Sequence, residues 1–259
     1  MRFPLWTYGT VLTALLLVPQ GVCAQDGPRR IPEAADEINS PEYWRDYRVG
    51  LEYHPIGAVV PKGRLRISGY TPMQPAGFRA SDLELRLNPT YGLGHGWEVT
   101  AGTTVAERLG RGGRAFFYGA GVQKQLAKET RTRPSLSLGG YGMIGVRNHK
   151  SGSVYAAASK RVLGGNAASY AVFLHGGAKF EGYDGDDYGS GTGLRPYLGA
   201  TLTLHRRFAI NAELSPSQPW QRDDMFAVRG TYLVYRSIGI TGGIRNAGYN
   251  TTSFVGLVF

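Results

Sequence analysis

Ser169 and His175 are the two residues whose types and spacing come closest to a catalytic pair. A serine hydroxyl beside an imidazole can act as an activated nucleophile, which is the chemistry of many hydrolases. The two residues are an even number of positions apart, so on one extended strand their side chains would share a face. The sequence alone places no Asp or Glu beside the histidine as its partner. A serine and a histidine on one strand are far more often structural, so we predict no catalytic residue and no enzyme.

Three aspartates, Asp184, Asp186 and Asp187, offer the oxygen ligands that calcium prefers. Their spacing matches no known calcium-binding loop, and a solvated turn accounts for them better. The stretch RLGRGGR at 108–114 has glycines spaced as in some phosphate-binding loops, but no helix pattern follows it. We interpret it as a basic loop that could lie near lipopolysaccharide phosphates. The sequence therefore predicts no metal ion and no cofactor.

The remaining candidates are charged residues that alternate with apolar ones. In DLELRL, the three leucines share one face of an extended strand, and Glu84 and Arg86 share the other. If the polar faces point into a bore, the wall carries more cations than carboxylates, and such rows of cations favour the passage of anions. An internal salt-bridge network that fills the bore is the alternative. The predicted lining residues are Arg86, Arg147, Lys179, Arg195, Arg229 and Arg245, with Glu84, Glu98 and Glu213.

These side chains must be positioned by β-strands, because the chain from Arg64 onward alternates apolar and polar residues almost throughout. Such alternation is weak in one segment and persuasive when it is repeated. The pattern predicts an all-β fold, a closed antiparallel transmembrane β-barrel of about twelve strands. The predicted segments are 62–70, 82–93, 97–107, 115–126, 135–147, 153–162, 167–181, 194–205, 207–214, 225–235, 238–245 and 251–259.

The N-terminus has the layout of a secretory signal peptide at 1–24. A short basic region at Met1–Arg2 is followed by the apolar run Thr10–Val18. Small residues then precede a predicted cleavage site between Ala24 and Gln25. The apolar run is shorter than the roughly 20 residues that a spanning helix needs. Cleavage also removes Cys23, the only cysteine, so the exported chain has no disulfide to stabilise it.

The mature chain is basic. Its 29 basic residues less Arg2, against 19 acidic residues, leave a net charge of +9. An exported protein does not meet nucleic acid, so the expected partners are anionic lipid, lipopolysaccharide and small anionic solutes.

The last strand, Thr251 to Phe259, alternates apolar residues and ends on an aromatic ring. It resembles the signal that bacterial outer-membrane β-barrels present to their insertion machinery. The resemblance to this class covers 62–259 and implies that Val255, Leu257 and Phe259 are read during assembly and that the protein resides in the cell outer membrane. The stretch LRLNPTYGLGHGWEVTAG is also similar to the transporter-like barrels grouped with the phenol-degradation MetA-pathway proteins.

With a periplasmic C-terminus, as in bacterial barrels, every second connection is a periplasmic turn. The outward connections, among them the Gly/Asp-rich 182–193, are generally longer, which is typical of transmembrane barrels. One periplasmic connection, 127–134, is long and runs against this trend. The other periplasmic connections are 94–96, 163–166, 206 and 236–237.

Outward aromatic residues agree with this orientation, because aromatic belts mark both membrane interfaces of a barrel. A soluble β-sandwich with scattered aromatic residues is the alternative. The expected periplasmic belt holds Tyr91, Trp97, Phe208 and Phe259, and the expected outer belt holds Phe116, Phe180 and Phe226.

Residues 25–61 differ from the rest and are expected to form a periplasmic N-terminal segment. SPEYWRDYRVG offers a helix start at Ser40 and a stop at Gly50, so a short helix is possible at 41–49. The competing interpretation is a strand at 47–54, which would replace 62–70 as the first strand of the barrel. We favour 62–70.

Two functions follow from this organisation. The first is a porin-like pore or narrow channel for small, anionic solutes. The second is a structural or assembly barrel that supports an envelope complex or the export of a surface polysaccharide. The number of strands does not decide between them, because barrels of about eight strands are filled by side chains and those of about sixteen hold a channel.

Overall fold

The computed structural model describes residues 51, 54–68, 82–108, 114–145, 149–164, 170–185, 189–204, 208–217, 224–235, 238–247 and 251–258. The chain divides into two compact units, Met1–Glu37 and Ile38–Phe259, and every described residue belongs to the second. The expected signal peptide with its cleavage site between Ala24 and Gln25, and the possible helix at 41–49, lie outside the described residues.

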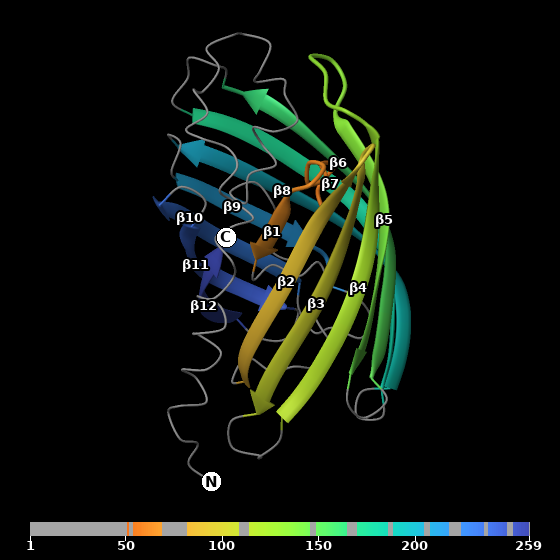
Figure 1. Cartoon of the computed structure of the whole chain (residues 1–259). Coiled ribbons are helices and arrows are strands. Elements are labelled where there is room, and N and C mark those ends of the chain that lie inside the picture. The colour runs from red at the N-terminus through yellow and green to blue at the C-terminus, as the bar shows by residue number, and fades with distance from the viewer. Residues whose placement is uncertain are drawn as a thin grey trace. The chain divides into compact units, whose positions relative to one another are not determined.

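The described residues form twelve β-strands and no helix. Figure 1 shows β2, β3, β4 and β5 side by side in the order of the chain. The strands are β1 (Leu65–Ser68), β2 (Asp82–Gly94), β3 (Trp97–Arg108), β4 (Arg114–Ala127), β5 (Ser135–Gly145), β6 (Lys150–Leu163), β7 (Tyr170–Gly185), β8 (Gly189–Leu204), β9 (Phe208–Ser215), β10 (Met225–Tyr235), β11 (Ile238–Ala247) and β12 (Thr251–Val258).

Each strand pairs antiparallel with its neighbours in sequence, and β1 pairs with both β2 and β12, so the order of pairing closes on itself as a barrel. The prediction of an all-β fold with twelve antiparallel strands is therefore confirmed. The first strand, β1, falls inside the predicted segment 62–70. Leu51 and His54, which belong to the competing segment 47–54, lie outside any strand.

One predicted loop is wrong. Most of 182–193 is strand, because β7 continues to Gly185 and β8 begins at Gly189, with those two residues paired. Glycine and aspartate are poor strand formers, but this preference amounts to only about 1 kcal/mol and depends on the neighbouring strand. Unbroken pairing along the β7–β8 hairpin outweighs it.

The strands have one apolar face and one polar face. Their exposed large side chains are mostly Leu, Val and Ile, which point outward, whereas threonine, serine and asparagine alternate with them and are buried inward. The expected belt residues Tyr91, Trp97, Phe116 and Phe180 are exposed. Phe208 and Phe226 are half-buried, and Phe259 lies outside the described residues.

The barrel has two ends, which we name by their connections. The turn end holds the tight β2–β3 turn at 94–97, in which Gly94, His95 and Gly96 all have positive φ. Glycine adopts this conformation without strain, and this explains a connection as short as this one. The loop end is the opposite end, where β7 meets β8.

Candidate functional site

Part of the N-terminal segment lies inside the barrel. Residues 54–61, which we call the inner segment, precede β1, and all but Pro61 are buried. The stretch IGAVV within it carries no charge, so its side chains can be removed from water without a charge to neutralise. Leu51 is buried as well and packs with Ile56, Phe173 and Tyr197. The described part of the expected periplasmic segment therefore lies against the inner wall.

Side chains of the wall bind the backbone of the inner segment. Gln123 Nε2 donates to the carbonyl oxygens of both Ile56 and Ala58, each at 2.9 Å. The amide of Val60 donates to Glu98 Oε2 at 2.6 Å. The inner segment lies outside the strand ladder, so these contacts satisfy backbone groups that would otherwise be buried without a partner.

Gly57 is a point of close contact between the inner segment and the wall. Its amide donates to Ser159 Oγ at 2.9 Å, and its carbonyl accepts from Ser135 Oγ and, at 3.5 Å, from Gln125 Nε2. A Cβ at this position would collide with the backbone of Ser135 and Ser159. Only glycine lets the backbone approach the wall so closely.

Three inward tyrosines fill space that inward glycines leave open. Each tyrosine is the directly opposite partner of a glycine on the neighbouring strand, and a Cβ on that glycine would collide with the ring. Aromatic rings therefore occupy the space beside these glycines. The pairs are Tyr141 over Gly121, Tyr155 over Gly139, and Tyr197 over Gly177.

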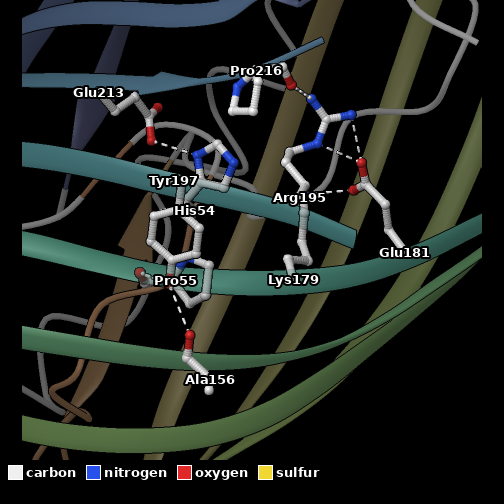
Figure 2. A network of polar contacts seen from close by, with 9 residues as sticks. All are labelled: His54, Pro55, Ala156, Lys179, Glu181, Arg195, Tyr197, Glu213 and Pro216. Atoms are coloured by element: carbon white, nitrogen blue, oxygen red, sulfur yellow. Dashed lines mark hydrogen bonds and ion pairs between the residues drawn. The ribbon is translucent and has the colours of Figure 1, made fainter. Parts of the chain in front are cut away.

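His54 and Glu213 join the inner segment to the far side of the bore (Figure 2). His54 Nδ1 lies 3.0 Å from Glu213 Oε2 and donates to that carboxylate. The imidazole is stacked on the ring of Tyr197 with centroids 4.4 Å apart, and Tyr197 Oη donates to the carbonyl of Pro55 at 3.0 Å. Burial lowers the pKa of His54 well below its ordinary value, and the charges of Lys179 and Arg195 lower it further.

Two buried cations and one carboxylate form the second half of this network, also seen in Figure 2. Lys179 on β7 and Arg195 on β8 are directly opposite in the ladder. Glu181 bonds both, with 2.7 Å to Lys179 Nζ and 2.6 Å to Arg195 Nε and Nη2. Arg195 Nη1 also donates to the carbonyl of Pro216 at 3.2 Å. Glu181 is therefore the carboxylate that both cations bind.

A series of hydrogen bonds joins inward side chains of four neighbouring strands, β6, β7, β8 and β9. Thr201 Oγ1 donates to Asn211 Oδ1 at 2.7 Å, so it accepts from His175 Nε2 at 3.0 Å. The other ring nitrogen, Nδ1, then accepts from Ser159 Oγ at 2.8 Å. His175 thus pairs with Ser159, the directly opposite residue on β6. Ser169, the serine considered from the sequence, lies outside the described residues.

The predicted lining residues fall into three groups. Arg147 lies outside the described residues, as do the side chains of Glu84 and Arg86. Arg245 is half-buried, with its guanidinium 5.4 Å from the ring of Phe254. The buried members are Glu98, Lys179, Arg195, Glu213 and Arg229.

Sequence reasoning missed most residues that bind the inner segment. Gln123 and Gln125 alternate with outward Val122 and Leu126, so the period-two pattern already assigns them to the inner face. Nothing in the sequence of Ile56–Val60 distinguishes a buried segment from a strand or a loop.

The structure describes only part of the expected assembly signal, which is Val255, Leu257 and Phe259. Val255 is exposed on β12, the side chain of Leu257 lies outside the described part, and so does all of Phe259.

Within the described residues, no group of three or more His, Cys, Asp and Glu side chains could hold a metal ion. Within the same residues, no helix is long and apolar enough to cross a membrane.

The chain matches no model of a known protein family, and it matches no curated protein.

Proposed function

We propose that the protein is a β-barrel of the bacterial outer membrane that admits small anionic solutes, with a bore that its own inner segment occupies at rest. The outward face supports the membrane location. It exposes large apolar side chains on strand after strand, and water would disfavour so many of them on a soluble protein. The signal-peptide pattern and the apolar final strand point to the same compartment.

In this proposal the turn end faces the periplasm and the loop end faces outward. Tyr91 and Trp97 at the turn end, and Phe116 and Phe180 toward the loop end, are exposed as interfacial aromatic residues would be. The location is tested by membrane fractionation and by gel migration. The folded barrel should partition with outer membranes and run faster unheated than boiled, and recovery in the soluble periplasm would contradict the proposal.

The preference for anions rests on one observation, the pairing of Lys179 with Arg195. Both side chains are buried on the inner face, Lys179 at 2% exposure and Arg195 at 0%, and both bind the carboxylate of Glu181. Lysine and arginine side chains that line a bore favour the passage of anions. Arg229, buried on β10, adds to the positive charge of the inner wall.

The inner segment is the element that closes this route. Its polar contacts reach β3, β4, β5, β6, β8 and β9, so it crosses the bore from one side to the other. Most of these contacts are single hydrogen bonds to backbone atoms, each worth only about 1 kcal/mol net. Residues 54–60 belong to no strand, so in this proposal the segment is displaced while the strands stay paired.

Conductance of the purified protein in planar bilayers tests the proposal. The mature chain should conduct weakly, and a variant lacking residues 25–60 should conduct more and show an anion-selective reversal potential. Retaining 61–64 keeps the contacts of Gly63 and Arg64 with Gly92 on β2. Arg229→Ser should weaken the selectivity of the deletion variant, and cation selectivity would contradict the proposal.

A packed structural barrel is the second candidate, and the tyrosines favour it. Tyr141, Tyr155 and Tyr197 cover glycines on the inner wall, and the inner segment lies among them. Such a barrel would anchor an envelope complex or support the export of a surface polysaccharide. A folded deletion variant with no conductance would favour this candidate.

A further inference from the structure

The connection between β4 and β5, residues 128–134, lies at the turn end of the barrel and carries exposed cations. The side chains of Lys128, Arg131 and Arg133 are exposed. The only carboxylate of the loop, Glu129, lies 3.6 Å from Lys160 Nζ. Among the residues that the structure describes, no carboxylate pairs with Lys128, Arg131 or Arg133.

The loop is held in a defined shape by Lys160 of β6. Lys160 Nζ donates to the carbonyl oxygens of Thr130, Arg131 and Arg133, the latter two at 2.9 and 3.4 Å. Within the loop, the Thr130 amide donates to the Arg133 carbonyl at 3.0 Å, and Thr130 Oγ1 accepts from the Arg133 amide at 3.1 Å. The two arginines are thus presented from an ordered loop, so little conformational entropy is lost when they bind a ligand.

The loop lies on the outward side of the wall. Ser159, next to Lys160, points into the bore and bonds Gly57, so the alternation of the strand turns Lys160 outward. Its directly opposite partner, Leu174, is exposed on the outer face as well. The carbonyls bound to Lys160 therefore bring Arg131 and Arg133 to the outer rim rather than to the bore.

Apolar and aromatic side chains continue from this rim up the outer face. Leu126, at 59% exposure, and Leu136 and Leu138 form an exposed apolar surface on β4 and β5. Beside them, Lys124 Nζ lies 4.9 Å from the centroid of the Trp97 ring and donates to the His95 carbonyl at 2.6 Å. A lysine that reaches past an indole toward polar groups is typical of a membrane interface.

We infer that this rim binds the phosphate headgroup of an anionic phospholipid, such as phosphatidylglycerol, in the leaflet that the turn end faces. Arg131 and Arg133 bind the phosphate, Lys128 adds charge, and the leucines contact the acyl chains. Arginine suits this role because its planar guanidinium bonds phosphate oxygens in pairs. The inference rests on the proposed membrane location.

Native mass spectrometry of the full mature barrel in mild detergent tests the inference. Phosphatidylglycerol should bind more tightly than zwitterionic phosphatidylcholine of the same chain length. Each of Arg131→Ser and Arg133→Ser should weaken the binding of phosphatidylglycerol by about fivefold, because one cation near an anionic lipid surface contributes roughly that factor. Arg131→Lys should retain more affinity than Arg131→Ser.

Two comparisons make the result specific. Lys150→Ser removes an exposed cation at the loop end and should leave the binding of phosphatidylglycerol unchanged. Glycerol phosphate, the headgroup without acyl chains, should compete poorly if the leucines contribute. Equal binding of the two lipids by the wild type, or no loss in the two serine variants, would overturn the inference. Fractionation of the same variants with outer membranes separates that failure from a failure of the proposed location.

Discussion

Lys179 and Arg195 stand directly opposite each other on β7 and β8, and both are bonded to Glu181. Like charges at opposite positions of a ladder are destabilising. The mostly buried carboxylate of Glu181 therefore offsets the repulsion between two buried cations at this level of the barrel.

Glu181→Gln should destabilise the barrel strongly. The substitution removes the shared carboxylate and leaves two buried cations opposite each other, which costs about 3 kcal/mol or more in the free energy of unfolding. Lys179→Met removes the repulsion instead and keeps the Glu181–Arg195 ion pair, so we expect a change of less than about 1 kcal/mol. Urea titration followed by tryptophan fluorescence measures both, and equal losses would show that the cations do not repel.

Gln123→Leu should release the inner segment from the wall. It removes the two hydrogen bonds to Ile56 and Ala58 and the acceptor of the Tyr155 hydroxyl. Ala58→Cys supplies a probe, since Cys23 is the only natural cysteine and lies in the expected signal peptide. Maleimide should label Cys at position 58 slowly in the wild-type background and faster with Gln123→Leu. Val122→Ala on the outer face is the matched control, and similar rates in both variants would argue against the role of Gln123.

Gly139→Ala should strain the contact between β5 and β6. The added methyl group would collide with the Tyr155 ring and the Val122 carbonyl, and overpacking of this kind costs about 1–3 kcal/mol. Gly142→Ala, on the same strand but facing outward, meets nothing within 4 Å and should change the unfolding free energy by less than about 0.5 kcal/mol. Equal unfolding free energies for the two alanine variants would contradict the expected collision with Tyr155.

Acidification should weaken the docking of His54. Burial, with Lys179 and Arg195, lowers the pKa of His54, so the docked imidazole is neutral. A lowered pKa in the folded state means that the released state binds the proton more readily, so the stabilisation is complete above about pH 6.5 and is lost as the pH falls. Labelling of Cys at position 58 should therefore accelerate in acid. His54→Gln should flatten this dependence, whereas His95→Asn, in the exposed β2–β3 turn, should not.

The strands were predictable because their signal is local. Val122 and Leu126 point outward and Gln123 and Gln125 inward, as the two-residue period of a strand requires. The same signal failed at Gly185 and Gly189, where glycine suggested a loop and the pairing of the hairpin decided the structure instead.

The interior of the barrel was not predictable in the same way. Tyr155 fills the space over Gly139 only because the register sets these two residues opposite each other, and register cannot be read from one strand. Lys179 and Arg195 were predicted to face inward, but their meeting at one carboxylate depended on which strands became neighbours. The path of the inner segment depended on residues far away in the chain.

The inner segment also constrains the order in which the chain can fold. Its contacts span long separations in sequence, 102 positions from Gly57 to Ser159 and 159 positions from His54 to Glu213. Contacts so distant in sequence form slowly, because a long loop must be closed before they contribute any stability. Residues 54–60 are among the first of the described residues to be synthesised. We expect them to be among the last to form their native contacts. Since β1 follows them directly, the segment must already lie on the inner side when β1 meets β12, or it is left outside a barrel that has closed without it.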